Sequence, residues 1–326
     1  MKMTIQRVNY ALSKPFVISG YQFTESQTIR VTLEDNEYIG HGEGVGVYYM
    51  GETQETMFQQ LLSVKSDIES SRIIDKSLSQ SLPPGGARNA LDCALWDLEA
   101  KASGISIHAR LGVQPKPLTT VFTIGISDIE SMAMEATVCA RFPVLKIKLD
   151  NNQPVERIEA IRRARPDAMI IIDANQAWSF AELKEYALRL SKLDVAMIEQ
   201  PLKRGFDEEL EEYSSPVLLG ADESCLHEGE YSVAKNRYDV INIKLDKCGG
   251  LTSALKIVEL AKNDQKRLMV GNMVGSSLSM APSHIIGQAC DFIDLDGPLL
   301  LSSDIEHGLQ YSSEGRVSAS TSALWG

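Results

Sequence analysis

VLKIKLD (residues 144–150) and VINIKLD (residues 240–246) are the two stretches that decide the fold of this chain. Each alternates apolar and polar side chains with the period of two that is typical of a β-strand. Apolar residues share one face, while Lys146 and Lys148 in the first stretch and Lys244 in the second share the other. A solvated surface strand could alternate in the same way. Lysines at corresponding positions of two strands instead favour a polar face that points into the mouth of a barrel.

Three acidic residues lie between these lysines, each at the end of an apolar run: Asp173 in IIIDAN, Glu199 in MIEQP and Asp222 in GADES. From Lys148 through the three acids to Lys244, the successive spacings are 25, 26, 23 and 22 residues. Each spacing fits one strand plus one helix. In a parallel βα barrel, the C-terminal ends of all strands converge on one mouth. We therefore expect an α/β barrel in which these five residues meet in space.

The βα alternation begins after VQPKPLTT (residues 113–120), whose prolines make it the best candidate for an interdomain link. Residues 1 to about 112 instead have the sequence pattern of a mixed α+β unit. In that unit TIRVTLED (residues 28–35) predicts a strand, and ARNALDCALWDLEAKASG (residues 87–104) predicts a helix. The strands expected beyond the link lie near residues 119–126, 144–149, 169–174, 195–199, 217–222, 240–245, 267–271 and 292–296.

The residue types at the expected mouth indicate a chemistry. Three carboxylates offer hard oxygen ligands, which suit Mg²⁺ and leave coordination positions for water or substrate. A lysine on either side of the acids supplies two candidate acid/base groups. The pattern predicts a site that removes a proton next to a metal-bound carboxylate. Simpler interpretations remain open, because Asp173 could cap a helix and Glu199 could be a solvated loop charge.

Composition excludes several classes of partner. The chain has 326 residues and a formal net charge of −12, and no basic face could dominate such a surface. We therefore expect no nucleic-acid partner and no membrane partner, since the apolar runs are also too short to span a bilayer. The first residues, MKMTIQRVNYAL, do not resemble a signal peptide. Five cysteines without CxxC spacing fit reduced thiols, so we expect a cytoplasmic protein.

Taken together, the motifs resemble the enolase superfamily, and within it the dipeptide epimerase branch. The order and spacing of the matching stretches agree throughout, and they cover the second half of the N-terminal unit and the whole barrel. DLDGP favours the dipeptide epimerases over other members of the branch. The matching stretches are PPGGARNALDCALWDLEA, VLKIKLD, IIDANQAW, IEQPL, GADESC, VINIKLDKCGGL and DLDGP.

The resemblance implies a modified TIM barrel, (β/α)₇β, with an α+β capping domain. It places the cap at residues 1–112, the barrel with the catalytic site at residues 113–298, and a C-terminal segment that returns to the cap at residues 299–326. It also implies a small-molecule dipeptide as substrate and one Mg²⁺ per subunit. Barrel enzymes of this branch are often assemblies, so a homo-oligomer is a further expectation.

Site residues carry over one by one onto the matching motifs. Asp173, Glu199 and Asp222 resemble the Mg²⁺ ligands, and Lys148 and Lys244 resemble two acid/base lysines on opposite faces of the substrate carbon. The implied reaction inverts the α-carbon of the C-terminal residue by two-base 1,1-proton transfer through a metal-stabilised enediolate. A lysine has an ordinary pKa of about 10.4, so nearby cations and desolvation must lower it for this role.

Two further groups complete the implied site. Asp294 and Asp296 resemble the pair that receives the α-ammonium group of the dipeptide. Lys146 resembles a group whose positive charge keeps Lys148 partly neutral. A simpler interpretation also exists for the acids, which could be turn formers before Gly297.

Specificity in this family is largely set by two mobile loops of the cap, here about residues 16–25 and 45–53. Members that act on Ala-Glu carry a basic residue in the first loop. This sequence has no Arg or Lys between Pro15 and Gln27, so an acidic substrate side chain would lack a counter-ion. We expect Ala-Glu to be a poor substrate.

The same loops offer aromatic and acidic side chains instead. Tyr21 and Phe23 could line an apolar pocket, while Glu25 and Glu52 could attract a cationic side chain. The sequence predicts cationic (Lys or Arg) or hydrophobic dipeptides as substrates, with a preference for the cationic ones.

Other functions compete with this interpretation. Within the superfamily, an N-acylamino acid racemase or a muconate-cycloisomerase or o-succinylbenzoate-synthase type of enzyme uses the same chemistry, but DLDGP has no obvious use for an acylated amine. A barrel aldolase could use Lys148 or Lys244 as a Schiff base, which borohydride would trap. A noncatalytic binding module would bind its ligand without exchanging an α-proton.

Overall fold

The computed structural model describes residues 1–70 and 78–326. The N-terminal part is a three-stranded antiparallel sheet in the order β1 (Lys2–Ile18), β2 (Tyr21–Asp35), β3 (Tyr38–Val45). Helix α3 (Gly86–Ser103) packs directly on β3, because alternate residues of the strand are glycines. A Cβ atom at Gly42 would lie 2.1 Å from the carbonyl oxygen of Ala90. The predicted strand at residues 28–35 lies within β2, and the predicted helix is α3, with Gly104 as its C-cap.

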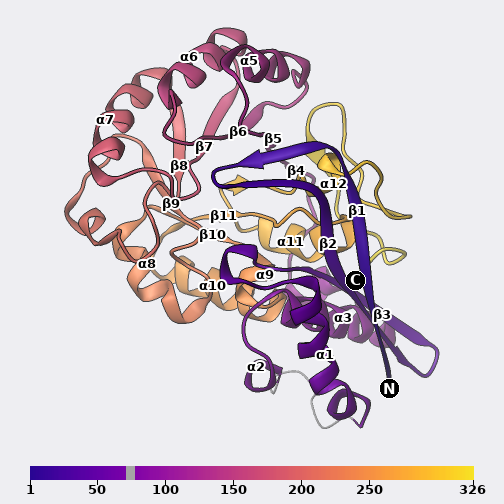
Figure 1. Cartoon of the computed structure of the whole chain (residues 1–326). Helices are drawn as coiled ribbons and strands as arrows, with labels where there is room; N and C mark the ends of the chain where they lie inside the picture. The colour runs from indigo at the N-terminus through magenta and orange to yellow at the C-terminus, as the bar shows by residue number, and fades with distance from the viewer. Residues whose placement is uncertain (71–77) are drawn as a thin grey trace.

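The segment 16–25, expected to be a mobile loop, is the end of the β1–β2 hairpin. Phe16 pairs with Phe23 and Ile18 with Tyr21 across a two-residue turn, and Gly20 has a φ of +77°. Glycine adopts this left-handed conformation without a steric penalty, which makes so tight a turn possible. Figure 1 shows this hairpin extending from the N-terminal sheet toward the barrel.

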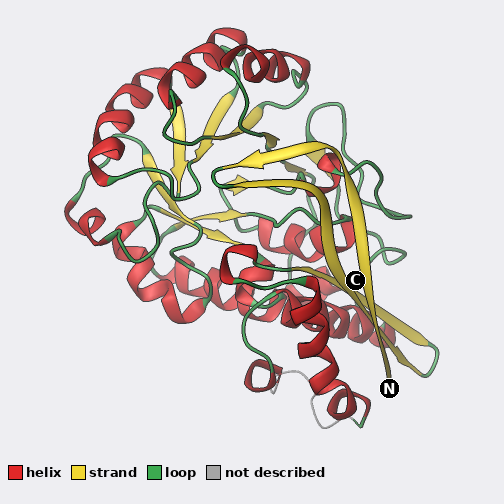
Figure 2. Ribbon diagram, in the orientation of Figure 1, coloured by secondary structure: helices red, strands yellow, loops and turns green. Residues whose placement is uncertain are grey.

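The second sheet is parallel and curls into a barrel, as Figures 1 and 2 show. Its strands are paired in chain order from β5 to β12 within the described residues. The backbone N–H of Val121 donates to the carbonyl of Ile293 (2.9 Å) and joins the two edges. The strands are β5 (Phe122–Ile124), β6 (Val144–Lys148), β7 (Met169–Asp173), β8 (Val195–Glu199), β9 (Leu218–Ala221), β10 (Val240–Ile243), β11 (Arg267–Val270) and β12 (Phe292–Ile293).

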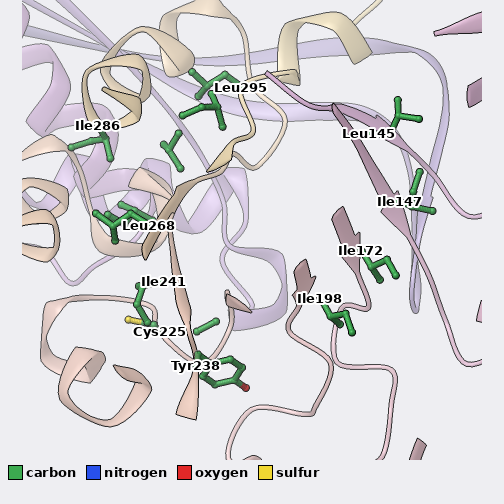
Figure 3. Close-up of a cluster of buried hydrophobic side chains, with 14 of the residues drawn as sticks. Leu145, Ile147, Ile172, Ile198, Cys225, Tyr238, Ile241, Leu268, Ile286 and Leu295 are labelled. Atoms are coloured by element: carbon green, nitrogen blue, oxygen red, sulfur yellow. The ribbon is translucent and has the colours of Figure 1, made fainter. Parts of the chain in front are cut away.

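Helices cover the outer face of the barrel (Figure 2). The alternation predicted for residues 144–149 is confirmed, because Leu145 and Ile147 belong to the large hydrophobic core, whereas Lys146 and Lys148 line the cavity. Figure 3 shows part of the outer core. The helices after the link are α5 (Ile129–Val138), α6 (Pro154–Ala164), α7 (Phe180–Leu190), α8 (Tyr231–Arg237), α9 (Leu245–Cys248), α10 (Leu251–Asn263), α11 (Ser277–Gly287) and α12 (Gly297–Leu300).

The remaining elements lie in the N-terminal part and near the chain end. In the N-terminal part lie α1 (Gln54–Glu69), α2 (Leu78–Ser81) and α4 (Ile107–Leu111), and the short strands β4 (Leu118–Thr119) and β13 (Arg316–Val317) pair with each other. At the chain end, the Trp325 indole donates to the carbonyl of Cys93 in α3 (3.0 Å). None of the described helices has the length and apolar character needed to cross a membrane. The parallel barrel and its α+β cap confirm the predicted fold class.

Candidate active site

The five residues singled out by their spacing meet at the C-terminal mouth of the barrel. Lys148, Asp173 and Glu199 are the last residues of β6, β7 and β8, and Asp222 and Lys244 directly follow β9 and β10. One carboxylate oxygen from each acid lies within 4.8 Å of the other two, and all three acids are buried. Buried acids gathered this closely need a cation to balance them, and three oxygen donors fit Mg²⁺.

Charge around the acids is set by burial and by the lysines. Burial opposes ionisation of Asp173, but Lys148 and Lys146 outweigh it and lower the pKa of this carboxyl to about 2. For Asp222, Lys244 and Lys247 likewise overcome burial and lower the pKa. These two acids are therefore ionised at neutral pH and available as metal ligands.

Glu199 differs from its two neighbours. Burial raises its pKa, and the nearby charge of Asp173 raises it further. Its Oε1 accepts a hydrogen bond from Asn242 Nδ2 (2.7 Å). Glu199 is thus the member of the group whose ionisation depends most on a bound cation.

The two candidate acid/base lysines contact different members of the acid group. Lys148 Nζ donates to Asp173 Oδ2 (2.6 Å) and to Asn175 Oδ1 (3.2 Å). Lys244 Nζ donates to Asp222 Oδ2 (2.6 Å). Burial disfavours the charged form of Lys244, but Asp222 overcomes this and raises the pKa of the ammonium group. A divalent cation that offsets the charge of the acids would relieve that effect and bring the pKa closer to the range of a base.

Lys146 joins two parts of the site. Its Nζ lies 2.8 Å from Glu199 Oε2 and 3.2 Å from Asp173 Oδ2, and it also donates to Asp294 Oδ2 (2.8 Å). Burial opposes its charge, yet Asp294 and the two metal-site acids raise its pKa well above the ordinary value. Lys146 and Lys148 share the same oxygen of Asp173, so a positive charge lies beside the candidate base.

Asp294 and Asp296 follow β12 and lie on the wall of the same cavity. Asn272 Nδ2 donates to Asp294 Oδ1 (2.8 Å), and the backbone N–H of Thr123 donates to Asp296 Oδ2 (2.6 Å). Burial, together with the charge of Asp294, raises the pKa of Asp296 to about 7. A pair of buried acids with one compensating lysine is suited to receive a further cation.

The cap closes the site and leaves a cavity of about 400 Å³. Phe23, Glu25 and Glu52 line it, whereas Tyr21 is 46% exposed and packs against Phe23 and Tyr48.

The two acids of the cap have different surroundings. Glu25 is exposed and accepts a hydrogen bond from Gln27 (2.7 Å). Glu52 Oε2 accepts the backbone N–H groups of Val47 and Gly86, each at 3.0 Å. Glu52 therefore holds the segment 45–53 in place, and its carboxylate is already occupied by the backbone.

Several site residues were not assigned from the sequence. Asn242 shares the polar face of its strand with Lys244, so the alternation could have found it. Lys247, in the motif KLDKCGG, lies 2.7 Å from Asp222 Oδ1 and also donates to the carbonyl of Asn242 (3.0 Å). Asn272 and Thr123 carry no local signal, because their roles depend on residues that are distant in sequence.

Comparison with known proteins agrees with this geometry. The N-terminal domain of the mandelate racemase / muconate lactonizing enzyme family matches residues 1–112, and an enolase C-terminal domain-like model matches residues 129–314. The fold and the site thus define a member of the enolase superfamily. The chain belongs to the mandelate racemase / muconate lactonizing enzyme family and, within the superfamily, to the dipeptide epimerase branch.

Two relatives show what the chain is similar to. The chain is 39% identical over 299 residues to N-acetyl-D-glutamate racemase from Pseudoalteromonas sp. The matched region covers 91% of this chain and 95% of the relative. The chain is also 38% identical over 307 residues to L-Ala-D/L-Glu epimerase from Escherichia coli. That matched region covers 93% of this chain and 95% of the relative. Both relatives are isomerases of amino-acid derivatives, as this chain is.

Solved structures show the same fold. An enolase family member from Agrobacterium tumefaciens with homology to dipeptide epimerases, with sodium and L-Ala-L-Glu bound, gives a TM-score of 0.96 at 38% identity over 99% of both chains. A dipeptide epimerase from Methylococcus capsulatus, complexed with Mg and L-Arg-D-Lys, gives 0.90 at 29% identity over 98% of both chains. The second of these structures holds Mg, and the buried group of Asp173, Glu199 and Asp222 offers three oxygen ligands that could hold such an ion in this chain.

Proposed function

We propose that this isomerase inverts the α-carbon of the C-terminal residue of a dipeptide, with Lys148 and Lys244 as its two acid/base groups. One observation carries the proposal: two buried lysines contact different acids of one metal-binding group, Asp173 and Asp222, at 2.6 Å each. A substrate carboxylate held at that group would bring its α-carbon between the lysines.

The residues of the chain divide the reaction between them. When bound, Mg²⁺ would offset the charge that develops on the substrate carboxylate as the α-proton leaves. One lysine takes the α-proton from one face of the carbon, and the other lysine delivers a proton to the opposite face, so the configuration inverts. One proton is lost and one is gained, and the exchange of roles between Lys148 and Lys244 allows the reverse reaction.

The pair Asp294 and Asp296 supports a substrate with a free amino terminus. Lys146 offsets the charge of Asp294 (2.8 Å), and an incoming ammonium group would offset that of Asp296. An N-acylated amino acid has no ammonium group to place beside Asp296. The N-acetyl-D-glutamate racemase among the relatives makes N-acyl amino acids the competing substrate class.

The cavity wall supports neutral or cationic side chains over acidic ones. Among the described residues that line it there is no arginine, and its lysines are Lys146, Lys148 and Lys244. Phe23 contributes an aromatic surface and Glu25 an exposed carboxylate. A lysine or arginine side chain could lay its methylene groups on Phe23 and keep its charge near Glu25.

A deuterium-exchange screen tests the proposal. The enzyme, with Mg²⁺ in D₂O, is incubated with a library of L-Ala-L-Xaa dipeptides and with the matching N-acetyl amino acids. We expect a mass gain at the C-terminal residue of dipeptides, together with formation of the L,D epimer. Faster exchange of the N-acetyl amino acids would assign the chain to that class instead. Borohydride should not inactivate the enzyme, since no Schiff base forms.

The cysteines support a cytoplasmic location as part of this proposal. All five are free thiols, and four of them are buried. Reduced thiols of this kind are typical of cytosolic proteins.

A further inference from the structure

A strained residue lies in the segment that links β11 to α11. Val274 has a φ of +60° and is the one β-branched residue among the described non-glycine residues at positive φ. A β-branched side chain strongly disfavours this region, so the surrounding contacts must impose it. Such residues are found preferentially at functional sites. Val274 lines the active-site cavity.

Three contacts hold Val274 in this conformation. Its N–H donates to Asn272 Oδ1 (2.7 Å). Its carbonyl accepts a hydrogen bond from the hydroxyl of Ser26, which belongs to β2 of the cap. Its side chain packs on the apolar cluster of Phe16 and Leu300. The cap therefore fixes the backbone of a barrel segment from 248 residues away in sequence.

The contact continues to the acids proposed to receive the substrate's amino terminus. Asn272 uses its carbonyl oxygen for Val274, which orients its amide nitrogen toward the acids. Nδ2 donates to Asp294 Oδ1 (2.8 Å) and lies 3.5 Å from Asp296 Oδ1. A continuous series of contacts thus runs from Ser26 through Val274 and Asn272 to Asp294.

The same segment is anchored to the cap a second time. Glu43 is fully buried, and its Oε1 accepts the backbone N–H of Ser276 (2.8 Å). Its Oε2 accepts the hydroxyl of Tyr10 (2.9 Å). Glu43 fixes the far end of the segment, which leaves Ser26 to control the part that bears Val274.

We propose that Ser26 is a positioning residue for the amino-terminal group of the substrate, acting through Val274 and Asn272 on Asp294 and Asp296. This inference rests on the proposed function, because it assumes a substrate with a free amino terminus. The cap then does more than cover the cavity, since one of its hydroxyl groups sets the geometry of a binding site in the barrel.

The alternative is that the Ser26 hydrogen bond only holds the cap on the barrel. The chain supplies a matched control for that purely structural role. Ser13, on β1, donates its hydroxyl to the carbonyl of Leu300 (3.1 Å). It makes the same type of bond from the cap, to the segment that directly follows the barrel, without contact to Asn272. Ser13→Ala therefore removes only a structural hydrogen bond of the cap, whereas Ser26→Ala removes the proposed positioning contact.

The test compares affinity for L-Ala-L-Leu with affinity for N-acetyl-L-Ala-L-Leu, by calorimetric titration of the Mg²⁺-loaded protein. We expect the wild type to prefer the free amine, and Ser26→Ala to reduce this preference at least about fivefold. Ser13→Ala and the hydroxyl-retaining Ser26→Thr should keep the preference within about twofold of the wild type. If the cap is only held less firmly, the affinities for both ligands should fall by the same factor and their ratio should stay unchanged.

Each outcome decides something. A preference in Ser26→Ala that stays within about twofold of the wild type overturns the positioning role and leaves the proposed function intact. A wild type without any preference for the free amine overturns the proposed function instead. Val274→Gly loosens the same backbone, and if Ser26→Ala does not fold, a preference in Val274→Gly that stays within about twofold of the wild type overturns the positioning role. If the two residues act together, Ser26→Ala has no further effect on the ratio in the Val274→Gly background.

Discussion

Lys146 Nζ lies 2.8 Å from Asp294 Oδ2, and both side chains are almost completely buried. The same nitrogen lies 2.8 Å from Glu199 Oε2. One buried cation thus joins the metal-binding acids to the acids proposed to bind the substrate's amino terminus. The two ends of the substrate are expected to interact with groups that share this lysine.

Lys146→Met tests the importance of that cation for stability. Methionine has a similar length but no charge, so Asp294 and Glu199 would remain buried without their partner. Breaking a buried ion pair costs about 3–5 kcal/mol. We expect the free energy of unfolding in urea, measured with EDTA present, to fall by about this amount.

Lys235→Met is the control for this measurement. Lys235 pairs with Asp264 at 2.9 Å, and both side chains are about one-third exposed. Surface pairs contribute about 0–1 kcal/mol, so this variant should lose little stability. Equal losses in the two variants would show that the buried ion pairs contribute no more to the free energy of unfolding than a surface pair does.

Metal dependence is the second prediction. Asp222→Asn removes one anionic ligand, and we expect weaker Mg²⁺ binding with an unchanged far-ultraviolet circular dichroism spectrum. Asp239→Asn changes an acid that lies just before β10, outside the metal-binding group, and should bind Mg²⁺ as the wild type does. Full activity of the wild type in excess EDTA, or of Asp222→Asn, would refute the metal assignment.

The third prediction separates the two lysines by stereochemistry. Lys148→Ala and Lys244→Ala should each reduce epimerisation at least about 100-fold, because general acid–base groups contribute on this scale. Each variant should still exchange the α-proton of one substrate epimer with D₂O, through the base that remains, and the two variants should differ in which epimer exchanges. Normal epimerisation by either variant would exclude a two-base mechanism.

Acid lability provides a fourth prediction, away from the active site. Burial, with the nearby ring of His108, lowers the pKa of His284 from 6.5 to about 4. Between these values the unfolded chain binds a proton that the folded protein does not, so stability falls as pH drops through this window and the effect vanishes above it. The shift corresponds to at most about 3–4 kcal/mol.

Two variants isolate this contribution. His284→Leu removes the titrating group with a similar volume, and its free energy of unfolding should fall less between pH 7 and pH 4.5 than that of the wild type. His307 has a 58% exposed side chain, and His307→Leu should keep the pH dependence of the wild type. An unchanged pH dependence in His284→Leu would assign the acid lability to other groups.

The meeting of the proposed metal-binding and acid/base residues at one mouth could be predicted because their positions obey local rules. Strand alternation fixes the face on which Lys148 and Lys244 lie, and the regular βα spacing places Asp173 at the same mouth. Spacing along the chain says nothing about which side chains touch across the barrel. The contact of Lys146 with Asp294 spans 148 residues and exists only once the barrel has closed.

The cap was less predictable for a related reason. The sequence predicts a strand at residues 28–35, but the family resemblance places a mobile loop at residues 16–25, where the structure has the end of a hairpin. In the structure a shift of register between Ala11 and Phe16 accommodates Pro15, which has no N–H to donate. Likewise, Glu52 has the charge of a substrate-binding residue, yet its partners are backbone N–H groups that the sequence does not mark.

The last prediction concerns the substrate side chain. An acidic side chain would have to lose its hydration without a free partner, because the described cavity wall holds no arginine and its three lysines already contact acids of the site. We expect kcat/KM for L-Ala-L-Lys or L-Ala-L-Leu to exceed that for L-Ala-L-Glu at least about tenfold, or ~1.4 kcal/mol. Phe23→Arg places a cation in the wall and should raise kcat/KM for L-Ala-L-Glu. Tyr21→Arg places it on a side chain that is 46% exposed and outside the wall, and should have less effect. Comparable turnover of L-Ala-L-Glu by the wild type would show that a basic group reaches the cavity from elsewhere.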